Sequence, residues 1–237
     1  MHIGLIGGIG PAATEFYYGG LVRNCMDSSA TLELTVAHAD MNVLLENMAA
    51  DARDQQAEVF LNHLDQLVGA GAAVAAVTSI AGHFCFAELE AISPLPLVSA
   101  LKALEQELGR RDIGRVGLLG SQIAIESHLY GSLIDFEVAL PSSKEIAAVS
   151  KEYFAMATAQ HANEAQRELF FSVGARLCSE QNAEVVVLAG TDMFLAFADA
   201  SPGFPVIDCA EVHIRELAVI AQKSVTQSAG RPAARVR

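Results

Sequence analysis

The chain has 237 residues, of which 52% are hydrophobic and 18% are charged, and its formal net charge is −13 at pH 7. This length suits one large domain or two smaller ones, and the composition is typical of a well-buried globular protein rather than a disordered one. The acidic balance argues against nucleic acid and against an anionic membrane surface as partners, because both require a basic footprint.

Apolar runs of strand length alternate with segments of helical period from the N-terminus onward. A short strand over 3–6 precedes a helix from Pro11 to about Met26, and a second strand is expected over 32–39. An apolar stripe at helical spacing over 60–68 then precedes a buried strand over 74–77, with another helix after His83. This alternation predicts parallel sheets that are covered by helices on both faces.

The same alternation continues after a linker with two prolines at 93–96. A helix carrying Leu97, Leu101, Leu104 and Leu108 comes first. Further strands are expected over 116–119, 136–140, 185–188 and 205–207. Further helices are expected from Ile123, around Leu169 to Leu177, and over 212–220.

Three landmarks occur twice, in the same order and about 112 residues apart. HIGLIGG at 2–8 matches RVGLLGS at 115–121, YGGL at 18–21 matches YGSL at 130–133, and TSIAGH at 78–83 matches LAGTDM at 188–193. We therefore expect two related α/β halves, 1–96 and 97–222, with a pseudo-twofold axis and a cleft between them. Part of the C-terminal helix is expected to pack back on the first half, and 223–237 to form a flexible tail.

Ligands of parallel sheets bind outside the carboxyl ends of the strands, where four strand-to-helix turns would converge. These turns, at 7–11, 78–83, 120–123 and 189–193, contain small residues, hydroxyls and glycines with hardly a formal charge. Backbone N–H groups at helix starts bind anions, and four hydroxyls would add neutral donors: Thr78, Ser79, Ser121 and Thr191. The pattern indicates a small acid as ligand; the alternative is that these hydroxyls are only N-caps.

The first turn also fits a dinucleotide fingerprint. Residues 8–13 satisfy G-x-G-x-x-G/A, and Asp40 would bind a ribose hydroxyl. Asp40 lies about 30 residues after the glycines, however, where about 20 is usual. The equivalent turn at 120–122 lacks the glycine spacing. The acid-binding interpretation is therefore preferred.

The four cysteines show no spacing typical of a metal site. Cys25, Cys85, Cys178 and Cys209 are expected to be reduced, mostly buried thiols of a cytoplasmic protein. The longest apolar runs fall short of the roughly 18 residues of a membrane span. The N-terminus enters a strand without the regions of a signal peptide.

The opening GLIGGIGPAAT with its paired tyrosines, at 4–18, resembles the start of the aspartate/glutamate racemase superfamily. The SIAGH turn, the VGLLGS strand and the AGTD turn follow in the order of that family, so that the resemblance covers about 1–222. It implies an isomerase of two pseudo-twofold-related subdomains, without a cofactor, as a homodimer acting on a small amino or dicarboxylic acid. It further implies one cysteine after a strand of each half, because inversion of a stereocentre needs a base and an acid on opposite sides.

The sequence departs from the family at those two positions. Ser79 stands in the place of the first cysteine and Gly190 in the place of the second. Ile80 and Ala81 replace the polar pair that holds the substrate, whereas His83, Thr191 and Asp192 keep their family character. The expected substrate-binding residues are Gly8, Ile9, Thr78, Ile80, Ala81, Ser121 and Thr191.

Racemisation by two thiols is therefore doubtful, since a serine hydroxyl is a weak base and glycine offers no group. Ser79 would need His83 to take its proton, although His83 could instead hold a backbone group. Asp192 could be a single base, or only a charge that complements a helix dipole. Cys85 would replace a thiol only in a shifted loop.

One-sided proton transfer, such as elimination, decarboxylation or tautomerisation, is the favoured chemistry. The alternative is a catalytically silent acid-binding protein that serves as a sensor or partner subunit.

Overall fold

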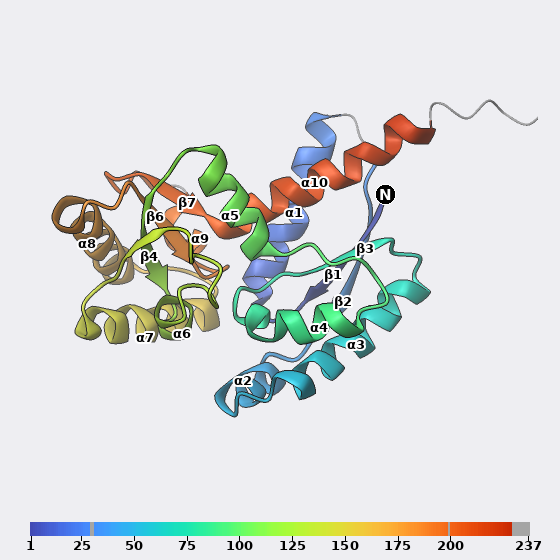
Figure 1. Ribbon diagram of the computed structural model, residues 1–237, viewed down its shortest axis with the longest axis horizontal. Helices are drawn as coiled ribbons and strands as arrows, with labels where there is room; N and C mark the ends of the chain where they lie inside the picture. The colour runs from blue at the N-terminus through green and yellow to red at the C-terminus, as the bar shows by residue number, and fades with distance from the viewer. Residues whose placement is uncertain (29–30, 199, 229–237) are drawn as a thin grey trace, which may run out of the picture.

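The computed structural model describes residues 1–28, 31–198 and 200–228, which form two parallel β-sheets with helices around them (Figure 1). The first sheet has the order β2-β1-β3 and the second the order β5-β4-β6-β7. Their strands are β1 (His2–Gly7), β2 (Glu33–His38), β3 (Val74–Val77), β4 (Arg115–Gly120), β5 (Glu137–Ala139), β6 (Val185–Ala189) and β7 (Val206–Asp208). The α/β architecture with parallel sheets that the sequence predicts is confirmed.

The two sheets repeat one arrangement of strands. In each half the first strand along the chain lies in the middle, with the second and third strands on either side of it. A single parallel bridge also joins Ala75 to Leu97, on the side of β3 that corresponds to the place of β7 beside β6. The expectation that Leu97 belongs to a helix is therefore wrong. The helix begins at Ala100, where the hydroxyl of Ser99 accepts a hydrogen bond from the Lys102 N–H.

Helices follow the strands in the same order in both halves. Before β4 the chain forms α1 (Pro11–Asp27), α2 (Met41–Ala49), α3 (Arg53–Gly69), the 3₁₀ helix η1 (Ala81–Cys85), α4 (Phe86–Ile92) and α5 (Ala100–Arg110). The second half has α6 (Gln122–Glu126), α7 (Ser143–Ala159), α8 (Glu164–Gln181), α9 (Phe194–Phe197) and α10 (Cys209–Ser228). The sequence reading did not anticipate α2 and α7, the helices that follow the second strand of each half.

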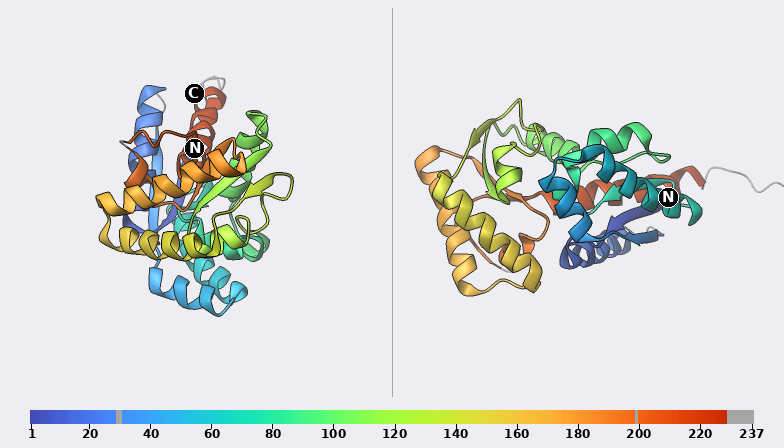
Figure 2. Two further views of the ribbon diagram at one scale, coloured as in Figure 1. Left: turned by 90° about the vertical axis from the view of Figure 1, so that its left-hand side faces the viewer. Right: turned by 90° about the horizontal axis from the view of Figure 1, so that it is seen from below.

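The last helix that follows the strands of each sheet packs against the other sheet. Leu104 and Leu108 of α5 are fully buried in the core around β4 and β6. Leu217 of α10 is buried beside β1 and α1, and Figure 1 shows α10 running from the second half to α1. The right-hand view of Figure 2 shows the two halves side by side. Through these contacts, α5 and α10 connect the two sheets.

The C-terminal helix is longer than the sequence pattern indicates. It continues to Ser228 and so includes the first residues of the segment expected as a tail, while 229–237 lie outside the described residues. Across the described part of the chain, no helix has the length and apolar character needed to cross a bilayer.

Candidate functional site

The turns at the carboxyl ends of β1, β3, β4 and β6 meet at one cavity between the two halves. The first half contributes Ile9, Gly10, Met41, Leu44, Leu45, Met48, Ser79, Ile80 and Ala81. The second half contributes Ser121, Tyr153, Phe154, Ala157, Ala189, Gly190 and Asp192. The cavity itself has a volume of only about 40 Å³, within a wider hollow of about 520 Å³ that includes space open to solvent. The unanticipated helices α2 and α7 supply much of the wall.

The structure brings most of the expected site residues to this cavity. Those that line it are Ile9, Ser79, Ile80, Ala81, Ser121, Gly190 and Asp192. Gly8, Thr78, His83 and Thr191 do not line it. Both Thr78 and Thr191 are buried, and the Thr78 hydroxyl donates a hydrogen bond to the carbonyl of Ile6 at 3.2 Å. Thr78 thus ties β3 to β1 through the group that was expected to bind an acid.

The glycines of the first turn are required by close packing. Gly8 has a φ of +90°, and a Cβ there would lie 2.4 Å from the carbonyl oxygen of Ala39. Gly10 has a φ of +106°, and a Cβ there would lie 2.8 Å from an oxygen of Asp192. Asp40, the candidate ribose ligand, is exposed and caps α2 by accepting a hydrogen bond from the Asn42 N–H at 2.8 Å. These contacts account for the glycine pattern without a dinucleotide.

The turn after β3 places Ser79 in the cavity wall and His83 behind it, outside the lining. Ser79 is buried, and its Oγ accepts a weak hydrogen bond from the Gly82 N–H at 3.4 Å. His83 Nδ1 lies 2.7 Å from the carbonyl oxygen of Ser79, and Nε2 accepts a hydrogen bond from the Ala100 N–H at 3.1 Å. Burial lowers the pKa of His83 to about 4, so that the ring is neutral. Both ring nitrogens are bound to the backbone, which favours the structural interpretation of His83 over the role of proton acceptor for the Ser79 hydroxyl.

The wall after β6 is different, because Tyr153 fills the space beside Gly190. A Cβ on Gly190 would lie 2.7 Å from two ring carbons of Tyr153 and 2.8 Å from its hydroxyl oxygen. Contacts under about 3 Å essentially never occur for a real Cβ. The phenol of Tyr153, from α7, therefore occupies the volume that a side chain at position 190 would need.

Asp192 is the acidic side chain of this wall, and it is almost fully buried. One carboxylate oxygen, Oδ2, accepts a hydrogen bond from the Tyr153 hydroxyl at 3.5 Å, and the nearby backbone N–H of Ala13 also lowers the pKa of the carboxyl group. The other oxygen, Oδ1, has no hydrogen-bond partner among the described residues. Ala13 lies in the first turn of α1, whose N-cap Gly10 has no side chain, so a carboxylate from the second half stabilises a helix start in the first.

Burial raises the pKa of Asp192 to about 6, although the hydrogen bonds from Ala13 and Tyr153 oppose this shift. A carboxyl group with such a pKa exchanges its proton near neutral pH, as a general base or acid must. Tyr153 is a residue that the sequence analysis missed. The S-x-x-E capping box at Ser142 and Glu145 is a signal for its helix, but nothing local places its ring against Gly190.

None of the cysteines is among the described side chains that line the cavity. Cys85 is buried and its thiol donates a hydrogen bond to the Gly82 carbonyl at 3.6 Å. Burial raises the pKa of Cys85 to about 12, which is the opposite of what a reactive thiol needs. Nor is any group of three or more His, Cys, Asp or Glu in the described residues placed to hold a metal ion.

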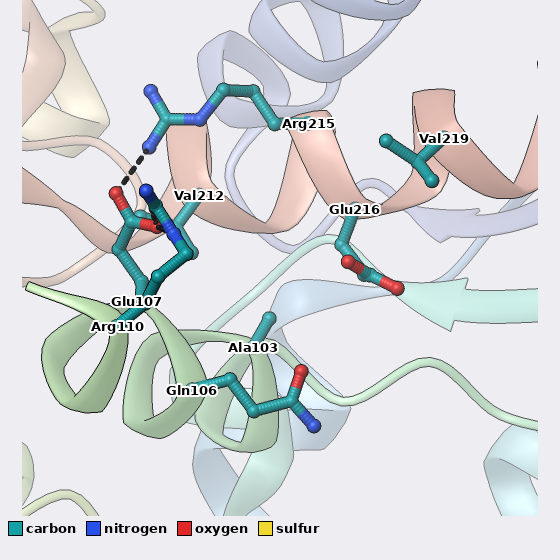
Figure 3. Close-up of a pocket in the computed structure, with 8 residues that line it drawn as sticks. All are labelled: Ala103, Gln106, Glu107, Arg110, Val212, Arg215, Glu216 and Val219. Atoms are coloured by element: carbon teal, nitrogen blue, oxygen red, sulfur yellow. Dashed lines mark hydrogen bonds and ion pairs between the residues drawn. The ribbon is translucent and has the colours of Figure 1, made fainter.

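A larger hollow lies between α5 and α10, on the outer surface (Figure 3). Three of its charged side chains are paired, because Glu107 forms ion pairs with Arg110 and Arg215. None of the expected site residues lines this hollow. The inter-half cavity is therefore the better candidate for chemistry.

Comparison with known proteins agrees with this architecture. A family model described as Asp/Glu/Hydantoin racemase matches residues 6–217. The crystal structure of a candidate Asp/Glu racemase from Yersinia pestis is 25% identical, with a TM-score of 0.81 over 93% of this chain and 99% of that chain.

Two more distant structures show the fold alone. An aspartate racemase homologue from Pyrococcus horikoshii OT3 is 23% identical, with a TM-score of 0.76 over 93% of this chain and 98% of that chain. A glutamate racemase from Francisella tularensis, solved with D-glutamate, is 12% identical, with a TM-score of 0.62 over 99% of this chain and 84% of that chain. No curated protein matches the chain.

Proposed function

Since this chain belongs to the Asp/Glu/hydantoin racemase family, we propose that it is a cofactor-independent enzyme that moves one proton, from one side, at the carbon next to a carboxyl group. The observation that carries this proposal is Asp192. It is buried, it lines the cavity between the halves, one of its oxygens has no hydrogen-bond partner among the described residues, and burial raises its pKa to about 6. The substrate is a small amino acid or carboxylic acid.

The proton transfer balances with Asp192 alone. The carboxylate of Asp192 accepts the proton from the substrate carbon, and the electron pair of the C–H bond moves into the adjoining carboxyl group. The protonated Asp192 then returns a proton to the same face of that carbon. Tyr153 is a positioning residue here, because its hydroxyl donates to Asp192 Oδ2 and fixes the carboxylate.

The opposite wall offers no second base. A serine hydroxyl is many pKa units too weak for this task, and both nitrogens of His83 are held by the backbone. Ser79 and Ser121 are instead available to hydrogen-bond the substrate carboxyl group, since both line the cavity. The expected reaction is exchange or one-sided transfer without inversion. The homodimer and the cytoplasmic location expected from the sequence stay predictions.

The test is hydrogen exchange in D2O with the L- and D-forms of aspartate, glutamate, leucine and methionine. We expect proton NMR to show loss of the α-proton signal, while chiral chromatography shows no inversion. Asp192→Asn should lower the exchange rate at least about 100-fold, because general-base catalysis contributes about that factor or more. The matched control is Asp40→Asn, which changes an exposed carboxylate outside the cavity to another good N-cap. Full exchange in Asp192→Asn, or inversion as fast as exchange, would overturn the proposal.

A second candidate function is binding without turnover. It is favoured by the wall after β3, where His83 is bound to the backbone and so cannot accept the proton of the Ser79 hydroxyl. It is also favoured by Gly190, which has no side chain that could transfer a proton. In that case a thermal shift with one of the same acids would occur without exchange of its α-proton.

A further inference from the structure

The inter-half cavity contains almost no charge. Among the described residues that line it, Asp192 is the only acidic side chain, and no lysine, arginine or histidine is present. A substrate with a second carboxylate would bring like charge next to Asp192 without a cation to offset it, in a site of low dielectric constant. The raised pKa of Asp192 shows that this site already disfavours negative charge.

The remaining wall of the cavity is apolar. Ile80 and Ala81 follow β3, and Ile80 is 1% exposed. Met41, Leu45 and Met48 line the cavity from α2, while Phe154 and Ala157 do so from α7. Such a set of aliphatic, thioether and aromatic groups offers apolar contact, and it leaves a carboxylate on a substrate side chain with no donor of its own.

Apolar side chains also continue outward from the cavity. An open hollow beside it shares Met48 and Phe154 and adds Ile123. Phe154 is 40% exposed and Ile123 is 37% exposed, although both are large hydrophobic residues. Because exposed apolar groups that cluster at a cavity mark sites of binding, this rim is suited to the end of an apolar substituent.

We infer that the substrate is an acid with a single carboxyl group and an apolar side chain, which packs between α2 and α7 with its end at Phe154 and Met48. The inference rests on the proposed function for the identity of the site, but it concerns affinity and not turnover. The carboxyl group lies at the polar end of the cavity, beside Ser79 and Ser121, and the apolar substituent extends along Ile80 toward the mouth.

The test is isothermal titration calorimetry with pairs of amino acids of similar size, leucine against aspartate and methionine against glutamate. We expect the apolar member of each pair to bind at least about tenfold more tightly. Phe154→Ala should weaken the binding of leucine and methionine several-fold, whereas Phe154→Leu, which keeps an apolar rim, should retain most of it. Val36→Ala, an exposed site on β2 outside the cavity, is the control for unspecific effects.

A charge-reversal variant sharpens the test. Met48→Lys places a cation at the rim, so it should raise the affinity for glutamate and lower that for methionine. Tighter binding of aspartate and glutamate to the unchanged protein would overturn the inference, and so would a failure of all four amino acids to bind. Tight binding of leucine or methionine without α-proton exchange would support the inference while contradicting the proposed catalysis, so the two proposals can fail separately.

Discussion

The two walls of the cavity are built on equivalent turns, yet they present different chemistry. After β3, Ser79 carries a short hydroxyl side chain, and His83 beside it binds only backbone. After β6, Gly190 has no side chain, and Tyr153 from α7 fills that space and donates to Asp192. The two turns have similar backbones, but the wall after β3 has no ionisable side chain in the cavity lining, whereas the wall after β6 has the carboxylate of Asp192. The repeated backbone therefore places side chains at equivalent positions, while the residue types and their neighbours set the chemistry of each wall.

The largest effect that would test this comparison is expected from Gly190→Cys. The new Cβ would collide with the ring of Tyr153, so we expect the free energy of unfolding to fall by about 3 kcal/mol, as for overpacked cores. Chemical denaturation in urea measures this change. Ser79→Cys, the equivalent substitution on the other wall, is the matched control and should cost about 1 kcal/mol or less.

Shortening the tyrosine should relieve the collision. Gly190→Cys combined with Tyr153→Ala is expected to regain stability relative to Gly190→Cys with Tyr153 intact. With Ser79→Cys added, thiols would face the cavity from both walls, and the triple variant should invert the α-carbon of a bound amino acid. If Gly190→Cys alone is as stable as the unchanged protein, Tyr153 does not occupy the place of the second thiol.

The next largest effect is the change with pH in the free energy of unfolding that Asp192 causes. Burial raises the pKa of Asp192 from 3.8 to about 6, so the folded protein binds this proton more tightly than the unfolded chain. The contribution of Asp192 to stability is therefore greatest below about pH 4 and is lost as the pH rises to about 6. Relative to the unchanged protein, Asp192→Asn should gain on the order of 2 kcal/mol across this window.

Denaturation at a series of pH values measures this difference. Asp208, whose pKa is raised by burial to about 7, is present in both proteins and cancels in the comparison. A difference that stays constant from pH 4 to pH 7 would show that Asp192 ionises as it does in water. The rate of α-proton exchange should rise over the same range, because the ionised form is the base.

The smallest effect is expected from Tyr153→Phe, which removes one hydroxyl and leaves the ring in place. The hydrogen bond to Asp192 is long, so stability should change by only about 1 kcal/mol. Because that bond lowers the pKa of Asp192, the midpoint of the exchange profile should move to higher pH. Tyr18→Phe, at an exposed position of α1, should leave the midpoint unchanged. An unmoved midpoint in Tyr153→Phe would contradict the positioning role.

Much of the fold could be predicted because its signals are local. Pro11 begins α1 as expected, and the buried runs of β1, β3, β4 and β6 lie where the apolar pattern placed them. Helices α2 and α7 are not among the predicted elements. α2 has only nine residues, and the sequence signal for α7 is the capping box at its start. The spacing of the leucines predicts a helix that includes Leu97, because a residue pattern does not show that the backbone of Leu97 pairs with β3.

The duplicated strand–turn–helix order can be read from the sequence alone, and so can Ser79 and Gly190 at equivalent turns, because both follow from residue types and their spacing. The contacts at these turns arise in three dimensions: both nitrogens of His83 are held by the backbone, Tyr153 lies against Gly190, and Asp192 is buried beside the start of α1. Steric exclusion and desolvation depend on neighbours far apart in the chain, so α7 must pack beside β6, and α1 beside the turn after it, before either effect exists.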